Sequence, residues 1–517
     1  MGEPFYITTA IHYPNGRPHI GHAYETIAAD VLARFHRSMG RDVRFQTGTD
    51  EHGLKMAQKA RELGQTPREL SDEMSSAFKD LFALLQISND RFIRTTEEAH
   101  HAASQELWKR MEANGDLYLD RYEGWYSIRD EAYYDESELS EGEGGQKLSP
   151  QGTAVEWTVE ESWFFRLSQY QDRLLAFYRE NPGFISPESR RNEVLRFVEG
   201  GLRDLSMSRT SFDWGVKVPG SEEHVMYVWV DALTNYLTGL GFPEETEEMK
   251  RYWPADVHLI GKDIVRFHAV YWPAFLMSAG IELPRMVYGH GFLLNRGQKE
   301  SKSLGNVTDP VALAESFGVD VLRYFLMREI SFGQDGSYSA EAIVTRGNAE
   351  LANGFGNLVQ RVASFVAKHC EGELAPTAPP TDPDRQLAET VRMLCAKNLP
   401  AQFEGLAFSQ GIEAWMQAVT ACNQYVDEQA PWALRKTDTD RMERVLTTLL
   451  GCIRDLCIAI TPVVPQSAGR MLDIVCAPDD QRSLAWLRAA GDPLANVARV
   501  SDPQPIFPRL QAPEPAA

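Results

Sequence analysis

No cysteine precedes Cys370 in this 517-residue chain. The six cysteines lie in the last third, mostly in apolar stretches with helical spacing, so we expect free, mostly buried thiols in a reducing compartment. They are Cys370, Cys395, Cys422, Cys452, Cys457 and Cys476. The chain also lacks any apolar run of about 18 residues, which excludes a membrane-spanning helix. Its N-terminus has no basic segment before an apolar one, so we expect no secretory signal and a cytoplasmic location.

Positive charge is scarce as well. Against 73 Asp and Glu stand only 52 Lys and Arg, a net charge of −21, which argues against broad, non-specific binding to nucleic acid. A local basic surface is still compatible with this total. The candidate is the Arg-rich stretch 189–196 with Arg203 and Arg209, for which a solvated mixed-charge helix is an equally good interpretation. No internal repeat is present.

Strands and helices alternate along much of the first 290 residues. Apolar, β-branched runs at residues 5–10 and 43–47 are typical of buried strands, and helical spacing follows each. Such alternation predicts a parallel, doubly wound sheet, and the length predicts two to four domains. The same pattern returns at 225–230, 257–260 and 286–288, where further strands are expected.

Two segments depart from this alternation. Residues 116–224 are rich in aromatic and acidic side chains with short alternations, which predicts an inserted, partly β module. From about Asp309 to Cys476 the spacing is helical, apart from a Pro-rich break at 373–380. The tail 501–517 holds five prolines and is expected to lie over the surface or to be disordered. The predicted fold class is α/β, with a doubly wound parallel sheet, an inserted mixed β module and a C-terminal all-α bundle.

The turn after the first predicted strand carries two histidines three residues apart, in His19-Ile20-Gly21-His22. Ligands of doubly wound sheets bind at the carboxyl ends of strands, where helix N-termini point, and glycine there lets the backbone approach a nucleotide. Imidazole N–H groups at this place could hold phosphate oxygens. Taken alone, such a pattern is more often a capping histidine and a core histidine.

A second segment, Lys-Glu-Ser-Lys-Ser at residues 299–303, forms a cationic loop with Gly305. Such a loop suits a departing pyrophosphate, although most short Lys/Ser stretches are solvated surface loops. Together, in this order and each after a predicted strand, the two segments indicate a site for the phosphates of ATP. Adenylyl transfer needs in-line positioning and fixed donors for the developing negative charge.

The two segments resemble the HIGH and KMSKS motifs of class I aminoacyl-tRNA synthetases. Strings at 6–16, 48–53, 227–232 and 260–268 narrow the resemblance to the methionyl-tRNA synthetase family, and it covers nearly the whole chain. The resemblance implies a methionine–tRNA ligase. Such an enzyme activates methionine with ATP and Mg²⁺ to methionyl-adenylate and transfers the methionyl group to methionine tRNA, both initiator and elongator.

The resemblance also implies residue roles. Asp50 matches the carboxylate that holds the α-ammonium group of methionine, and an aromatic and aliphatic wall suits a thioether. That wall is matched by Ile11, Tyr13, Trp229, Tyr236, Ile264 and His268, of which Trp229 and Tyr236 would otherwise be taken for core aromatics. The implied catalytic residues are His19, His22, Lys299 and Lys302. The implied ATP site adds Gly21, Glu25, Gly261 and Asp263.

The helical region contains strings at 353–361 and 428–432 that resemble the family's anticodon-binding helices. Asn357 and Arg361 are four residues apart and would share one helical face, near Asn353. An exposed Trp432 would stack an unpaired base. Without the resemblance, a Trp432 buried between helices is the better interpretation.

The implied division of the chain has six parts. They are a Rossmann-like catalytic domain in two halves (1–115 and 225–290), an inserted connective module (116–224), a KMSKS-loop and stem-contact region (291–345), an α-helical anticodon-binding domain (346–480) and a Pro-rich tail (481–517). The dimerisation and tRNA-binding module of longer relatives does not follow the helical region, so a monomer is expected.

Two departures from the family pattern stand out. Glu300 takes the place of the usual Met of the second motif, and we expect it to point to solvent because the matching lysines and serines around it are intact. Many relatives carry a cysteine zinc knuckle in the inserted module. This chain has no cysteine there, and thiolate ligands are needed for such a knuckle, so no structural zinc is expected and no other metal site is predicted.

Four alternatives are disfavoured by the sequence. Leucine, isoleucine and valine enzymes need a large editing insertion for which this chain has no room, and a cysteine enzyme needs N-terminal cysteines for a zinc thiolate site. An RNA-binding protein on an inactive synthetase scaffold is disfavoured by the intact His19, His22, Asp50 and Lys302. A small-molecule nucleotidyltransferase shares an HxGH motif but has no need of the helical region.

Overall fold

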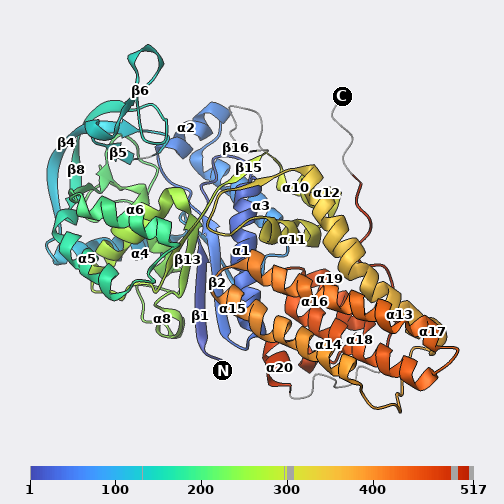
Figure 1. Ribbon diagram of the computed structural model, residues 1–517. Coiled ribbons are helices and arrows are strands. Elements are labelled where there is room, and N and C mark those ends of the chain that lie inside the picture. The colour runs from blue at the N-terminus through green and yellow to red at the C-terminus, as the bar shows by residue number, and fades with distance from the viewer. Residues whose placement is uncertain (1, 131, 296, 300–307, 491–498, 512–517) are drawn as a thin grey trace.

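The computed structural model describes residues 2–130, 132–295, 297–299, 308–490 and 499–511. Three parts follow one another across the molecule: the inserted module, a central sheet with its helices, and an elongated helical region (Figure 1). The N-terminal strand lies in the middle, between the other two parts. Within the described part of the chain, no helix is both long and apolar enough to cross a membrane.

A six-stranded parallel sheet forms the centre, which confirms the predicted α/β architecture. Its strand order is β3-β2-β1-β13-β14-β9, and Ile7 of β1 pairs with Phe45 on one side and Val257 on the other. The strand order reverses between β1 and β13, and in such sheets ligands bind in the crevice at that switch point. The strands are β1 Pro4–Thr9, β2 Asp42–Thr49, β3 Arg91–Arg94, β9 Ile185–Ser186, β13 Val257–Gly261 and β14 Val287–His290.

Helices cover both faces of this sheet. The longest is α1, whose Ile27, Val31, Leu32 and Phe35 are almost fully buried, as their spacing predicts. These helices are α1 Ile20–Ser38, α2 Leu54–Leu63, α3 Pro67–Leu84, α4 Glu98–Ala113, α7 Val228–Thr238, α8 Glu247–Tyr252 and α9 Trp272–Ala279, the last preceded by a π-helical turn at Phe267–Tyr271.

The strand predicted at residues 225–230 is wrong. Only β12, Val225–Met226, is extended; it pairs with β11, Ser208–Arg209, and α7 begins at Val228. Ten residues of α7 are buried, so its apolar side chains surround the helix instead of forming a stripe. A short apolar run of this kind does not distinguish a buried strand from a buried helix.

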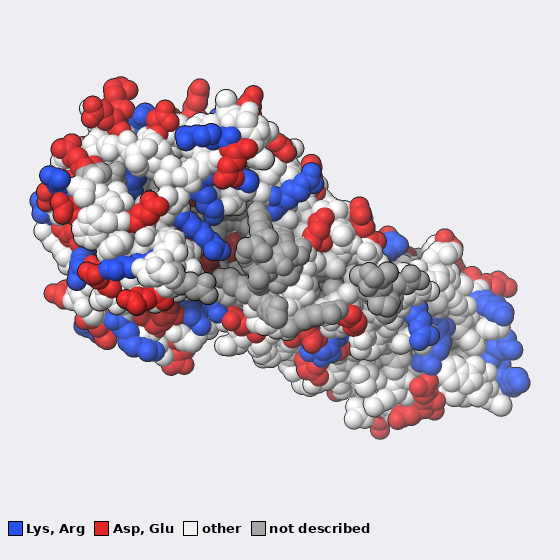
Figure 2. Space-filling model, turned by 90° about the horizontal axis from the view of Figure 1, so that it is seen from above, with Lys and Arg blue, Asp and Glu red and all other residues white. Residues whose placement is uncertain are grey.

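The C-terminal part is a helical region, as predicted. Its four buried cysteines lie among the helices, whereas Cys476 is exposed and Cys370 partly so. The tail lies over this region up to residue 511, with hydrogen bonds in both directions between Asn348 and Leu510. Figure 2 shows Lys and Arg side chains gathered at the tip of the helical region. The main helices are α10 Pro310–Phe317, α11 Val319–Glu329, α12 Ala340–Arg346, α13 Asn357–His369, α14 Asp382–Met393, α15 Leu399–Glu404, α16 Phe408–Gln429, α17 Pro431–Leu434, α18 Thr439–Ile460, α19 Pro465–Ile474 and α20 Leu484–Ala489.

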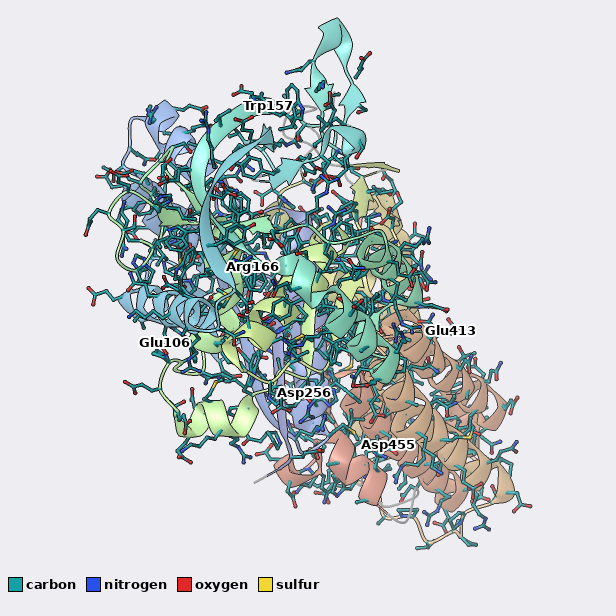
Figure 3. All side chains as sticks on the ribbon, turned by 90° about the vertical axis from the view of Figure 1, so that its left-hand side faces the viewer. Glu106, Trp157, Arg166, Asp256, Glu413 and Asp455 are labelled. Carbon is teal, nitrogen blue, oxygen red and sulfur yellow. The ribbon has the colours of Figure 1, made fainter. Side chains whose placement is uncertain are left out.

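The inserted module is built on a long antiparallel pair, as its alternating pattern predicts. Trp157 lies on the outer face of this curved pair (Figure 3). Arg209, proposed for a basic surface, is instead buried, and its guanidinium lies 4.5–5.4 Å from the ring centres of three tyrosines. The elements are β4 Leu117–Ser127, β5 Ala132–Tyr134, β6 Ser140–Glu141, β7 Lys147–Leu148, β8 Glu156–Phe165, β10 Leu205–Ser206, α5 Gln171–Glu180 and α6 Glu188–Glu199.

Candidate active site

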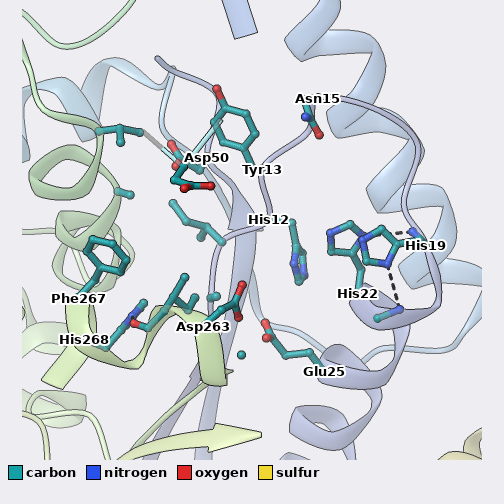
Figure 4. Close-up of a pocket in the computed structure, with 18 of the residues that line it drawn as sticks. His12, Tyr13, Asn15, His19, His22, Glu25, Asp50, Asp263, Phe267 and His268 are labelled. Carbon is teal, nitrogen blue, oxygen red and sulfur yellow. Dashed lines mark hydrogen bonds between the residues drawn. The ribbon is translucent and has the colours of Figure 1, made fainter. Parts of the chain in front are cut away.

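A cavity of about 770 Å³ opens at the switch point, at the carboxyl ends of the parallel strands. In Figure 4, Tyr13, Asp50, Phe267 and His268 lie on one side of it and His19 and His22 on the other. All seven predicted methionine-pocket residues line this cavity, and so do six of the predicted ATP-site and catalytic residues. The first set is Ile11, Tyr13, Asp50, Trp229, Tyr236, Ile264 and His268; the second is His19, Gly21, His22, Glu25, Gly261 and Asp263.

His19 and His22 cap the start of helix α1. Nδ1 of His19 accepts from the backbone N–H of Gly21 at 3.1 Å, and Nδ1 of His22 accepts from the backbone N–H of His19 at 3.1 Å. A ring nitrogen that accepts carries no proton, so both imidazoles are neutral and keep their proton on Nε2. Each ring therefore caps the helix with one nitrogen and has a donor on the other. The capping interpretation is confirmed for both rings, and the donor role towards a phosphate stays a prediction.

Gly21 leaves room for the His19 ring. A Cβ atom built there would lie 2.9 Å from Cε1 of His19, so a side chain at this position would force the ring to shift. The two imidazole centres are 3.8 Å apart, which puts both rings at one helix end. Because that end carries the positive pole of the helix dipole, the place favours an anion.

His12 supports His22 from beneath and was missed in the sequence. Its ring stacks on Phe78, with centres 5.3 Å apart, and meets His22 edge-on at 4.9 Å. Burial lowers the pKa of His12 to about 3, so the ring is neutral at physiological pH. Its Nε2 lies 3.3 Å from the hydroxyl of Thr26, which itself donates to the His22 carbonyl. A lone histidine beside a strand gives no sequence signal for this contact.

One side of the cavity has a neutral aromatic wall. Trp229 stacks flat on Phe267 with ring centres 3.7 Å apart; Phe267 was not predicted. Nδ1 of His268 lies 3.0 Å from the Ile264 carbonyl and donates to it, so Nε2 accepts from the Tyr236 hydroxyl at 2.7 Å. Burial lowers the pKa of His268 to about 4, which keeps it uncharged near pH 7. Such a wall suits an apolar, polarisable side chain.

Asp50 and Tyr13 form a polar part of the same side of the cavity. Asp50 is 8% exposed, and its backbone N–H donates to the His12 carbonyl at 2.9 Å, which ties the end of β2 to the end of β1. The Tyr13 hydroxyl donates to the His52 carbonyl and accepts from the Met56 N–H, each at 3.0 Å. A carboxylate in the same cavity as a neutral wall suits a ligand with a cationic group at one end and an apolar group at the other.

Glu25 and His290 share one proton at the floor of the cavity. Nδ1 of His290 carries a proton and donates it to the Gly291 carbonyl. A second proton lies in the 2.9 Å hydrogen bond between His290 Nε2 and Glu25 Oε2, so the two side chains together have no net charge. Burial raises the pKa of Glu25. Its Oε1 is buried with no hydrogen-bond partner among the described residues. An acceptor of this kind suits a ligand hydroxyl. His290 was not predicted.

Gly261 is the last residue of β13, and Asp263 follows it on the same floor. A Cβ atom at Gly261 would lie 2.7 Å from Oδ1 of Asp263, so glycine lets this carboxylate approach its own strand end. Three residues of the inserted module also line the cavity, namely Arg129, Asp130 and Gln151. No sequence pattern had indicated that this module reaches the site. Among the described residues no group of three or more His, Cys, Asp or Glu could hold a metal ion.

The second motif follows a short hairpin beside the cavity. Strands β15, Leu293–Asn295, and β16, Gln298–Lys299, pair antiparallel, and β15 also pairs with β17, Gly336–Tyr338. Lys299 is thereby placed by its backbone, opposite Leu294. The predicted Lys302, and Glu300 with its expected exposure, lie outside the described residues.

The four predicted anticodon residues lie in or beside the long helices far from the cavity. Trp432, at the start of α17, is 42% exposed, so the alternative of a buried tryptophan is wrong. The guanidinium of Arg361 lies 5.8 Å from its ring centre and is paired with Asp427 at 2.9 Å. Asn353, in a π-helical segment at Gly347–Gly356, and Asn357, at the start of α13, are exposed.

The switch-point cavity, the capping histidines and the separate helical region together define the architecture of a class I aminoacyl-tRNA synthetase. The family described as tRNA synthetases class I (M) matches residues 5–363, and the one described as the anticodon binding domain of methionyl tRNA ligase matches residues 377–514. The chain therefore belongs to the methionyl-tRNA synthetase family, and the resemblance inferred from its motifs is confirmed.

Named relatives agree over their full lengths. The methionine--tRNA ligase of Brucella melitensis is 56% identical over 98% of both chains, and that of Rhizobium meliloti is 54% identical over 99% of both. The solved structure of Mycobacterium tuberculosis methionyl-tRNA synthetase in complex with methionyl-adenylate superposes with a TM-score of 0.95 at 54% identity, covering 98% of this chain and 100% of that one. The apo form gives a TM-score of 0.89 at 51% identity, covering 99% of each chain.

Proposed function

We propose that this chain joins methionine to its tRNA in two steps within the switch-point cavity. The observation that carries the proposal is the joining, in one cavity, of a neutral aromatic wall, a carboxylate and two capped histidines with proton-bearing Nε2 atoms. The wall and the carboxylate suit methionine, and the donors at the positive end of α1 suit the phosphates of ATP. Mg-ATP is the nucleotide substrate.

Methionine is held at both ends. Asp50 binds the α-ammonium group, and the thioether lies against Trp229 and Tyr236. Neutral His268, fixed between Tyr236 and the Ile264 carbonyl, adds no charge to this wall. Ile11 and Tyr13 close the pocket on the side of β1. The substrate carboxylate is then left pointing towards the phosphate-binding histidines.

The first step is in-line attack of the methionine carboxylate on the α-phosphorus of ATP, which forms methionyl-adenylate and releases pyrophosphate. The Nε2–H donors of His19 and His22, with Lys299 and Lys302, meet the developing negative charge. Gly21 gives the phosphates room at the helix start. Glu25, Asp263 and the Gly261 backbone hold the ribose. No covalent enzyme intermediate forms.

In the second step the terminal adenosine hydroxyl of the tRNA attacks the activated carbonyl carbon, and AMP leaves. The anticodon is bound far away, at the tip of the helical region. Trp432 stacks an unpaired base, and Arg361, Asn357 and Asn353 offer donors beside it. The positive side chains gathered at this tip favour the RNA backbone there although the whole chain is acidic (Figure 2).

The inserted module is held without zinc. Asp130 accepts hydrogen bonds from Ser149, Thr153 and Tyr134, which ties together the segments 127–134 and 149–153. Such a network can order a small module in place of a metal. Metal analysis of the purified protein tests this directly, and one stoichiometric zinc ion would contradict it.

Other parts of the proposal concern the whole protein. It is a cytoplasmic monomer that charges both initiator and elongator methionine tRNA, and its six parts divide near residues 115, 224, 290, 345 and 480. Sedimentation equilibrium at micromolar concentration is expected to give the mass of one chain, 58.2 kDa.

The deciding experiment is amino-acid-dependent pyrophosphate exchange with a panel of amino acids. Exchange is expected with methionine and to be at least 10²-fold weaker with leucine, isoleucine, valine and cysteine, because those side chains leave the wall underfilled or misfit it. Exchange with none of them, alongside retained tRNA binding, would favour an inactive scaffold instead. Preference for another amino acid would overturn the methionine assignment alone.

A further inference from the structure

A buried carboxylate joins three elements behind the methionine side of the cavity. On α7, Asp231 has its Oδ2 2.6 Å from Nδ1 of His52 and its Oδ1 2.7 Å from Nε2 of His100. His52 belongs to the loop after β2, and His100 to α4. These three side chains are at most 2% exposed and are not part of the cavity lining. Any effect of the cluster on a substrate therefore passes through the residues that it holds.

Packing alone gives no reason for a charge at this place. Apolar side chains of the same volume are often as stable as a buried ion pair or more so. Burial raises the pKa of Asp231, but its contacts with His52 and His100 lower it below the ordinary value, so the carboxyl group is ionised. His100 is fixed on its other side, with Nδ1 3.0 Å from the Thr238 hydroxyl. Directional hydrogen bonds of this kind fix the relative position of the three elements more strictly than apolar contacts do.

The elements so fixed carry both ends of the proposed methionine site. His52 lies two residues after Asp50, and Asp231 lies two residues after Trp229 on the helix that also carries Tyr236. The pocket residue Tyr13 is tied to the same point, because its hydroxyl donates to the His52 carbonyl. The bond between His52 and Asp231 is thus the short side-chain link from the ammonium-binding loop to the thioether-binding helix.

We propose that His52, Asp231 and His100 form a positioning cluster that sets the distance between the ammonium-binding carboxylate and the thioether wall, and so selects amino acids by side-chain length. The inference rests on the proposed function, in which Asp50 and Trp229 are the two ends of the site. A misplacement of the substrate by about 1 Å can lower the reaction rate about 10²-fold. A loosened loop therefore lowers the rate most for methionine, which fits the site well. Homologues of methionine that already fit poorly lose less rate.

The test compares two substitutions of one residue. His52→Leu removes the donor to Asp231 with little change in volume, whereas His52→Asn keeps an amide N–H near the place of Nδ1. Pyrophosphate exchange is measured with methionine and with its homologues one methylene shorter and one longer. Asp116→Asn serves as a matched control, because Asp116 is also buried and hydrogen-bonded, to Tyr170 and Ser278, but does not line the cavity.

His52→Leu is expected to raise the KM for methionine by about 10–100-fold, because a misplaced ammonium-binding loop no longer holds the substrate in its bound geometry. The KM for ATP stays within about threefold, and the preference for methionine over both homologues falls about tenfold. His52→Asn and Asp116→Asn are expected to keep the wild-type preference. A merely structural role would lower the yield of active protein and leave the preference unchanged.

If folded His52→Leu keeps the wild-type preference for methionine over its homologues, the proposal is overturned. If His52→Leu does not fold, the same preference is measured in Asp231→Asn, which keeps the size of the side chain and one acceptor. Absence of methionine-dependent exchange in the wild type would overturn the proposed function instead, so the two failures are distinguishable.

Discussion

The two ring nitrogens of His22 have different roles. Nδ1 accepts from the His19 N–H and so caps α1, while Nε2 carries the donor that we assign to the phosphates. Asparagine places an amide oxygen near the Nδ1 position and has nothing at Nε2. Glutamine places an amide N–H near the Nε2 position and leaves the His19 N–H without its acceptor. The pair of variants therefore separates capping from catalysis.

Loss of one donor to a developing charge costs about 2.7–4 kcal/mol, or 10²–10³ in rate. His22→Asn and His22→Ala are thus expected to lower methionyl-adenylate formation by about 10²–10³ with little change in methionine KM. Loss of a helix cap costs about 1 kcal/mol of stability. His22→Gln is accordingly expected to unfold more easily but to keep most of the rate.

The assay is methionine-dependent pyrophosphate exchange at saturating methionine and ATP, with urea unfolding in parallel. The opposite order, a fast His22→Asn and a slow His22→Gln, would refute the donor role and leave capping as the function of this histidine. Unchanged exchange in His22→Ala would refute both the donor role and the cavity as the site of adenylation.

Three further predictions test other parts of the molecule. Trp432→Ala is expected to lower kcat/KM for tRNA charging by about 5–150-fold, the equivalent of about 1–3 kcal/mol of lost stacking, with pyrophosphate exchange preserved; equal loss of both would contradict the anticodon assignment. Arg323→Met should cost about 3–5 kcal/mol in urea unfolding, because it removes the fully buried one of the two arginines paired with Asp30 and frees three carbonyls that Arg323 now binds; in an Asp30→Asn background the same change should cost less, and equal costs would refute the pairing. Burial raises the pKa of Asp384, but hydrogen bonding from Arg441 outweighs this and lowers it to about 2, so the stability that Asp384 adds is present above pH ~4 and is lost as the pH falls towards 2. The stability difference between wild type and Asp384→Asn should therefore shrink between pH 5 and pH 3, and a constant difference would contradict the ionised pair.

Much of the fold could be predicted because its signals are local. The first strand, the turn with two histidines and the amphipathic helix α1 are contiguous, and each has its own spacing of apolar residues. The helix α7 could not be predicted, since an element that is apolar on every side shows neither helical nor strand spacing. Arg209 was placed on a surface because charge normally indicates exposure, whereas three tyrosines from other segments surround it.

Within the site, residues inside long motifs were found and isolated ones were missed. Glu25 could be proposed because it follows the first motif. Its partner His290 is 265 residues away and lies in none of the motifs on which the predictions were based. His12 and Phe267 adjoin predicted residues, yet only the packing shows that one supports His22 and the other supports Trp229. Contacts of this kind depend on the sheet order, which local spacing does not determine.

The sheet order also has a consequence for synthesis on the ribosome. Strand β1 pairs with β2 soon after it emerges, but its other neighbour, β13, lies 250 residues further along the chain. At about 5–20 residues per second, the ribosome needs about 12–50 s to deliver that partner. Throughout this interval the apolar edge of β1 is open to pairing with other chains. A strand that is central in the finished enzyme is thus an open edge in the nascent chain, and a chaperone that covers strand edges should raise the yield of folded protein.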